Sequence, residues 1–183
     1  MFKLLSLLSL ALFASNASSE KLLRVIARPV GEVSGSFIFH EKQVLASGSS
    51  SDYEKKLFLD VKLKDLTPNS IYNYHVHVLP VPANGSCAAT LLHFDPTGKN
   101  KLDGSYKCNP ADIKGTCEYG DLSGYFGPAT VNSAGEVYEK TFQIDYLSLD
   151  STSDLSILGR SVVIHNSTGG RIACGNLIKV SKC

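Results

Sequence analysis

The chain has 183 residues, and its 18 Lys and Arg against 17 Asp and Glu give a formal net charge of +1. Nucleic acids and anionic membranes are bound through strongly basic surfaces, so this balance argues against both as partners. The length suits one domain with a real hydrophobic core. An anionic substrate would have to be attracted by a local charge, because a net charge so close to zero, and zero once Lys3 is lost with the signal peptide argued below, offers no long-range attraction.

Residues 1–17 have the pattern of a secretory signal peptide. Lys3 supplies a positive start, an apolar run extends to Ala14, and the small residues that follow suit cleavage. The run is too short to span a bilayer, and the charged start disfavours the alternative of a buried N-terminal helix. We therefore expect a signal peptide over residues 1–17, give or take a few residues, and a single domain over residues 18–183. The product would be secreted, with no membrane anchor.

Short strand-like stretches separated by turn residues fill much of the domain. They cover residues 22–27, 33–39, 56–63, 71–80, 142–149, 161–165 and 171–180. Residues 56–63 alternate between apolar and polar, which is typical of a half-buried strand. No stretch has a helical period, and we interpret His40 as a solvated turn residue after the second stretch. The pattern predicts an all-β sandwich or barrel.

Between residues 80 and 126 the strand pattern stops, and Gly, Pro, Asn and Lys dominate. A structureless stretch of this length is usually functional or held by cross-links. The stretch contains Cys87, His93, Cys108, Cys117, Glu118 and Asp121, which can serve as metal ligands, acids or cross-links.

Two histidines of the stretch 71–80 are two residues apart. On a strand, His75 and His77 point to the same face, so both imidazoles can reach one metal ion. Two surface histidines, or two with satisfied hydrogen bonds, would give the same pattern. His93 and His165 strengthen the metal interpretation, and His40 alone lies outside the set. Four imidazoles suit copper but are also accepted by zinc.

Five short motifs then occur in a recognisable order: His75-Val-His77; Cys87 followed by His93-Phe-Asp-Pro; Gly120-Asp121-Leu; Gly159-Arg160-Ser-Val-Val-Ile-His165; and Arg171-Ile-Ala-Cys174-Gly. Together they resemble the copper/zinc superoxide dismutases, and in particular the secreted fungal copper-only branch of that family. The resemblance implies an eight-stranded Greek-key β-barrel, a superoxide dismutase-like and immunoglobulin-like sandwich. It also implies that superoxide is converted to oxygen and hydrogen peroxide by Cu(II)/Cu(I) cycling. The copper ligands would be His75, His77, His93 and His165.

Two departures point to the copper-only branch. The family places further zinc-binding histidines between the positions of His93 and Gly120, whereas residues 94–120 contain none. We therefore expect one copper ion per chain and no zinc, although His93 and two carboxylates offer a poor alternative zinc site. The second departure is that five residues separate His165 from Arg171, so the family's long electrostatic loop is missing. The copper should consequently be more open to solvent.

Three further residues are candidates for roles beside the copper. The resemblance places Arg171 near the metal, where its charge would attract superoxide; the alternative is a surface arginine. Glu118 stands where the last zinc-binding histidine is expected, and we hypothesise that it orients His93 and helps to supply a proton. Asp121 would mainly hold the loop. The alternative is that both acids only stabilise the loop.

The five cysteines indicate disulfides in a secreted protein. The resemblance pairs Cys87 with Cys174, and Cys108 and Cys117 most simply pair within one loop. Cys183 is left either free or paired between chains, and we expect a monomer. Sequons begin at Asn16, Asn84 and Asn166, and predict a glycoprotein in which Asn166, beside His165, stays unmodified.

Other functions fit the sequence less well. A copper-binding or copper-buffering protein without turnover would need the histidines but not Arg171. A structural domain that has lost its metal would not need all four histidines. A copper oxygenase often uses an N-terminal histidine, which the expected mature start lacks.

Overall fold

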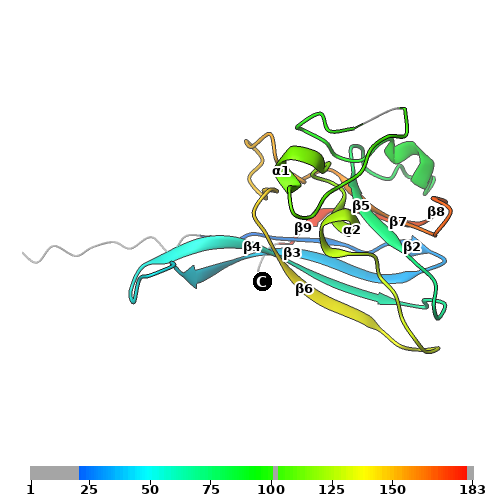
Figure 1. The fold of residues 1–183 in the computed structure, drawn as a ribbon, viewed down its shortest axis with the longest axis horizontal. Helices are drawn as coiled ribbons and strands as arrows, with labels where there is room; N and C mark the ends of the chain where they lie inside the picture. Colours follow the sequence, from blue (N-terminus) through cyan, green and yellow to red (C-terminus); the bar gives the residue numbers. More distant parts are fainter. Residues whose placement is uncertain (1–20, 101–102, 181–183) are drawn as a thin grey trace, which may run out of the picture.

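The strands form two antiparallel sheets in the computed structural model, which describes residues 21–100 and 103–180. The order in the first sheet is β6-β4-β3-β1-β9, and in the second β2-β8-β7-β5 (Figure 1). The first sheet contains β1 (Arg24–Ala27), β3 (Ser34–Leu45), β4 (Tyr53–Lys64), β6 (Tyr138–Ile144) and β9 (Ile178–Lys179). The second contains β2 (Val30–Gly31), β5 (Asn73–His77), β7 (Ser161–His165) and β8 (Arg171–Asn176). The expected signal peptide, its sequon at Asn16 and Cys183 lie outside the described residues.

Two segments of the chain cross from one sheet to the other and join the sheets along one side. The first runs from β1 through Arg28 and Pro29 into β2, and the second runs from β8 through Leu177 into β9. The two segments pair with each other in both sheets, since β1 pairs with β9 and β2 with β8. The expected last strand over residues 171–180 is therefore divided between the sheets.

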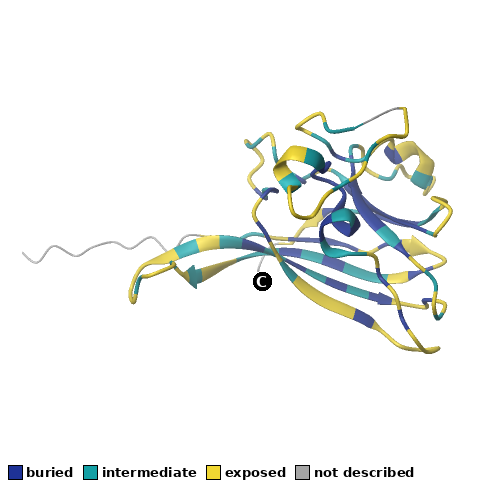
Figure 2. Cartoon of the chain, in the orientation of Figure 1, coloured by how far each residue is buried: buried dark blue, intermediate teal, exposed yellow. Residues whose placement is uncertain are grey.

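The hydrophobic core lies between the two sheets (Figure 2). β3 and β4 alternate, so that Phe37, Phe39, Leu59, Val61 and Leu63 are fully buried while their neighbours are not. The opposing sheet contributes Tyr74, Val76, Val162 and Ile164. Full burial of one such aliphatic or aromatic side chain stabilises the fold by about 1.5–3 kcal/mol, so these strands hold the framework rigidly.

β5 and β7 are buried on their outer face as well. All five residues of β7 and the last four of β5 are buried, although only every second one faces the core. The long segment after β5 covers the outer face and contains three short helices: η1 (Cys87–Thr90), α1 (Ile113–Thr116) and α2 (Leu122–Phe126). None of the helices in the described part of the chain is long and apolar enough to cross a membrane.

The all-β fold expected from the sequence is confirmed, with differences in the strand limits. β3 continues past His40 to Leu45, because it pairs with β4 along its whole length. The interpretation of His40 as a solvated turn residue was wrong: it lies in β3, with Nε2 3.0 Å from Asp60 Oδ2.

The strand expected over residues 142–149 was also misplaced. β6 begins at Tyr138 and ends at Ile144, because its pairing with β4 starts beside Leu63. Leu147 and Leu149 are buried in the following loop, so their apolar character comes from core packing rather than from a strand.

Candidate metal centre

The outer face of β5 and β7 carries three of the four candidate histidines. Partners directly opposite each other in an antiparallel pair share a face, and so do residues two apart on one strand. Asn73 pairs with His165 and His75 pairs with Val163. His75, His77 and His165 therefore point away from the core, toward the covering segment.

The fourth histidine reaches this face because its segment lies along the free edge of β5. Phe94 N donates to Val76 O at 2.8 Å, and His93 bridges to His77. Gly120 completes this edge, since Val76 N donates to Gly120 O at 2.8 Å. A Cβ at Gly120 would lie 2.3 Å from Val76 O, so only glycine permits this approach.

The nitrogen atoms that the four histidines offer all lie within 4.8 Å of one another. The second nitrogen of each ring has a hydrogen-bond acceptor. Nδ1 of His77 and Nδ1 of His165 donate to the carbonyl oxygens of Leu91 and Gly169, at 2.9 and 3.1 Å. Nδ1 of His93 donates to Glu118 Oε2. A carbonyl or an ionised carboxylate can only accept, so in the neutral form of these three rings Nε2 is the unprotonated nitrogen and faces the centre.

His75 is turned the other way round. Its Nε2 donates to Ser123 Oγ at 3.2 Å and lies 3.3 Å from Asp121 Oδ1. Its Nδ1 is buried and has no hydrogen-bond partner. Nε2 of His77 and Nε2 of His165 are 3.3 Å apart, which places two lone pairs in contact. An orphaned nitrogen and two converging lone pairs fit a bound cation, and the donor set fits copper or zinc.

His75, His77 and His165 are also held neutral, as metal ligands must be. Burial is the main cause that lowers the pKa of His75 to about 4 and that of His77 to about 2, and the charges of neighbouring groups add to it for His77. Burial likewise lowers the pKa of His165. His93 keeps 24% of its side chain exposed, so the centre is open to solvent on this side.

The two candidate acids contact different histidines. Glu118 is 1% exposed and accepts from His93 Nδ1 and from Asn100 Nδ2. Asp121 faces His75 and caps α2 by accepting from Gly124 N at 2.8 Å. Burial alone would raise the pKa of Asp121, but the hydrogen bond and charge of His75 outweigh it, so the pKa is lowered. The alternative zinc site would need Glu118 and Asp121 to converge with His93 on one point. Among the described residues the metal-ligating group that contains His93 includes neither acid.

A shift in strand register brings Arg171 to the histidines. Ile164 pairs with Ala173, but His165 pairs with Arg171, so one residue of β8 is skipped. Such irregularities re-aim side chains beside functional sites. The charge of Arg171 consequently contributes to the lowered pKa values of His77 and His165. The interval between His165 and Arg171 is a compact turn in which Asn166 N donates to Gly170 O.

Arg171 also holds the segment that orients His77. Its guanidinium donates to the carbonyl oxygens of Cys87 and Ala88 at 2.9 and 3.1 Å, to Leu91 O, and to Thr90 Oγ1. The Cys87–Cys174 disulfide attaches the same segment to β8. The second disulfide joins Cys108 to Cys117, next to Glu118.

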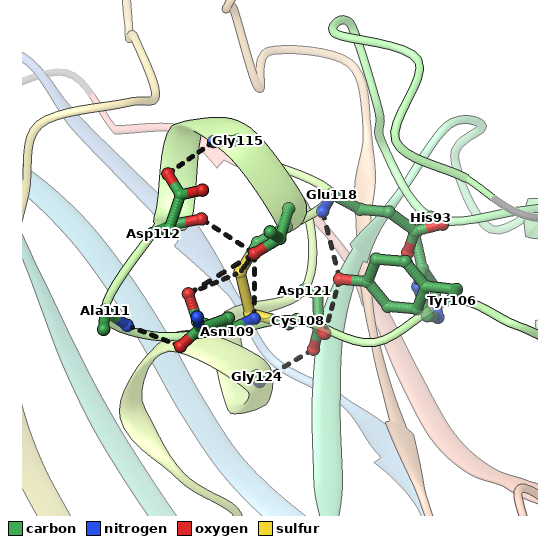
Figure 3. Close-up of a disulfide and its surroundings, with 12 residues drawn as sticks. His93, Tyr106, Cys108, Asn109, Ala111, Asp112, Gly115, Glu118, Asp121 and Gly124 are labelled. Atoms are coloured by element: carbon green, nitrogen blue, oxygen red, sulfur yellow. Dashed lines mark hydrogen bonds and ion pairs between the residues drawn. A yellow bond between two sulfur atoms is a disulfide. The ribbon is translucent and has the colours of Figure 1, made fainter.

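Some residues of the centre carry no sequence signal that would single them out. Thr90 is fully buried, with Oγ1 3.1 Å from His77 Nδ1. Ser123 accepts from His75, and Asn100 donates to Glu118. Tyr106 joins the two acids, as Figure 3 shows. Their roles depend on how distant loop segments meet, which spacing along the chain does not reveal.

Fold and site together define an all-β protein with a four-histidine metal centre. Residues 44–177 match the copper/zinc superoxide dismutase (SODC) family, and the chain belongs to this family. The "Candida albicans Superoxide Dismutase 5 (SOD5), Cu(II)" structure has a TM-score of 0.65 and 30% identity, over 88% of this chain and 94% of that chain.

Two curated relatives match a shorter part of the chain. The "Cell surface Cu-only superoxide dismutase" of Arthroderma benhamiae is 38% identical over 60% of this chain and 28% of its own length. The "Cell surface Cu-only superoxide dismutase 5" of Candida albicans is 38% identical over 65% of this chain and 47% of its own length. The chain thus spans less than half of these curated relatives.

Proposed function

We propose that this protein is a secreted copper-only superoxide dismutase, which converts superoxide to oxygen and hydrogen peroxide. The observation that carries the proposal is the convergence of four histidine ring nitrogens, with each ring fixed through its other nitrogen. His75 would bind copper through Nδ1, and His77, His93 and His165 through Nε2. Imidazole ligands serve both Cu(II) and Cu(I), and copper bound here supplies one-electron exchange with superoxide. The names of the curated and solved relatives support copper as the metal.

The task of Arg171 is to draw the anion to the open side of the centre. Net charge supplies no attraction, so the guanidinium beside His77 and His165 has to act locally. Its hydrogen bonds to the segment 87–91 keep the charge in place. A protein that only stores copper would have no need of this arrangement.

Glu118 has two tasks in the proposed mechanism. It accepts the Nδ1 proton of His93, and this fixes the ring so that Nε2 faces the centre. Because His93 is the ligand with a solvent-exposed edge, Glu118 can also help to pass a proton toward peroxide. Asp121 orients His75 in the same way and, as the cap of α2, holds the loop.

Dismutase activity and copper content measured on one purified sample test the proposal. We expect near-stoichiometric copper and rapid removal of superoxide, with neither in a His75→Ala, His165→Ala double variant. Full copper content without turnover would support a copper-buffering protein instead. Failure to retain copper would contradict both functions.

Export and glycosylation belong to the same proposal. We expect residues 1–17 to be removed on secretion and the mature chain to be a monomer without nucleic-acid or membrane partners. Asn84 is exposed and suits a glycan, whereas the Asn166 side chain closes the turn beside His165 by accepting from Gly170 N at 2.8 Å. Intact-mass and glycopeptide analysis of secreted protein would test cleavage and occupancy.

A further inference from the structure

One phenol lies between the two acids that orient His75 and His93. Tyr106 Oη donates to Asp121 Oδ2 at 2.8 Å and accepts from Glu118 N at 3.0 Å (Figure 3). Burial, followed by the nearby charge of Asp121, raises the pKa of Tyr106, so the hydroxyl remains a donor. A single side chain is thus bonded to both acidic residues.

The Cys108–Cys117 disulfide holds this phenol in place. Tyr106 comes two residues before Cys108, and Glu118 comes directly after Cys117, so the cross-link attaches the segment that carries the phenol to the segment that carries the acids. Asn109 N donates to Thr116 Oγ1 at 2.9 Å inside the small loop that the disulfide closes. The loop is therefore braced by both covalent and hydrogen bonds.

We propose that Tyr106, held by the Cys108–Cys117 disulfide, is a positioning residue for the metal centre. It acts through Asp121 on His75, and through the backbone of Glu118 on His93. The inference rests on the proposed metal site and adds a residue and a cross-link to it.

The geometry at Asp121 shows why the hydroxyl matters. Oδ1 faces His75 Nε2 and Gly124 N, while Oδ2 faces the phenol. Without the hydroxyl, Asp121 Oδ2 would be a buried acceptor that receives no hydrogen bond. Leaving a buried acceptor without a donor is costly in free energy. The carboxylate would turn or admit water, and the His75 ring would lose its fixed orientation.

The chain offers a matched control. Tyr125 is also a largely buried tyrosine near Asp121, but its hydroxyl has no hydrogen-bond partner among the described residues. Tyr106→Phe and Tyr125→Phe each remove one hydroxyl and keep the ring. Only the first removes a bond to the acids.

The first experiment needs no metal. In metal-free, full-length protein, NMR follows exchange with water of the His75 Nε2 proton and, as an internal reference, of the His165 Nδ1 proton bonded to Gly169 O. We expect Tyr106→Phe to speed exchange at His75 about tenfold and to leave His165 unchanged. A general loss of stability would speed both. Unchanged exchange at His75, or equal acceleration at both rings, would overturn the proposal.

The second experiment measures Cu(II) affinity by competition with a chelator, together with the electron paramagnetic resonance spectrum. Groups that hydrogen-bond to metal ligands typically contribute 10- to 100-fold to metal affinity, so Tyr106→Phe should lower the Cu(II) affinity about tenfold and shift the copper hyperfine splitting.

A Cys108→Ser, Cys117→Ser variant should lose a similar factor in Cu(II) affinity, and adding Tyr106→Phe to it should lower the affinity little further. Additive losses, or Tyr106→Phe behaving like Tyr125→Phe, would contradict the proposal. If the wild-type protein binds copper but lacks dismutase activity, the proposed function is refuted. The proton exchange and the copper affinity of Tyr106→Phe would still test the role of Tyr106.

Discussion

Arg171 acts on the centre in two ways. Its charge helps to lower the pKa values of His77 and His165, and its N–H groups donate hydrogen bonds to the segment 87–91. Arg171→Ala should slow dismutation by about tenfold, the lower end of electrostatic steering effects, while copper stays bound. The wild-type rate should also fall with added salt, because attraction between exposed charges is screened. Stopped-flow measurement of superoxide decay across ionic strengths checks both.

The control for this change is Arg171→Lys, which keeps the charge but not the forked hydrogen bonds. It should retain the salt dependence and lose part of the rate. If Arg171→Ala reacts at the wild-type rate, Arg171 is only a structural arginine.

Glu118 should matter for both metal retention and proton supply. Glu118→Gln can still accept from His93 through its amide oxygen, so copper should stay bound while the pH dependence of the rate changes. Glu118→Ala leaves His93 Nδ1 without its acceptor, and copper affinity should fall about 10- to 100-fold. Copper titrations and rate–pH curves on both variants make the test. If both variants kept the wild-type copper affinity and the same rate–pH curve, Glu118 would have no role in the mechanism.

The metal-free protein should lose stability in mild acid. His75 and His77 have folded pKa values of about 4 and about 2, below the ordinary value of 6.5, so the unfolded chain binds more protons below pH 6.5. Their contribution is complete above pH 6.5 and is lost as the pH falls from there toward 4. Urea unfolding at a series of pH values would show this slope, and a flat free energy of unfolding between pH 7 and 5 would contradict it.

The histidines could be named from the sequence, but not which nitrogen each presents. Spacing of two residues put His75 and His77 on one face, and that reasoning depends only on strand geometry. The reversed ring of His75 follows from Ser123 and Asp121, which approach from a loop distant in sequence. A pattern along one strand contains no information on such contacts.

At the scale of elements, the long segment after β5 depends on its attachment to β8. The Cys87–Cys174 disulfide closes a loop of 87 residues, and Arg171 bonds to the same segment. Cys87→Ser should lower the free energy of unfolding by roughly 4–5 kcal/mol on the chain-entropy account and weaken copper retention through His77. Chemical unfolding and copper content check this, with Cys108→Ser, Cys117→Ser as the comparison. Unchanged stability and copper content in Cys87→Ser would show that the Cys87–Cys174 disulfide does not support the metal centre.

The sequence was more reliable on which stretches form strands than on where the strands end, because tertiary pairing sets their limits. The strand over residues 161–165 was predicted to the residue, whereas β3 and β6 were misjudged at their ends. Pairing with β4 fixes both, and no local signal near His40 or Tyr138 reports it. The register shift that places Arg171 is likewise a property of two strands together.

For the whole molecule, the metal content is the most direct prediction. After incubation with both metals we expect close to one copper per chain and little zinc, because residues 94–120 supply no histidine and Glu118 and Asp121 are already bonded to other groups. Elemental analysis decides this, with a zinc-binding member of the family as the positive control. Stoichiometric zinc in a second site would contradict the copper-only assignment.

The two segments that cross between the sheets also set an order of events during synthesis. β1 can pair with β3 early, but its other edge must wait for β9, and β2 must wait for β8. The centre likewise lacks His165 and Arg171 until late in the chain. A ribosome delivers His75, His77 and His93 long before that point, so a nascent chain holds an incomplete coordination set. The full set of four histidines is therefore brought together only after β7 has been made and has paired with β5. A metal ion that is to contact all four histidines must then be present in the compartment where these last strands pair.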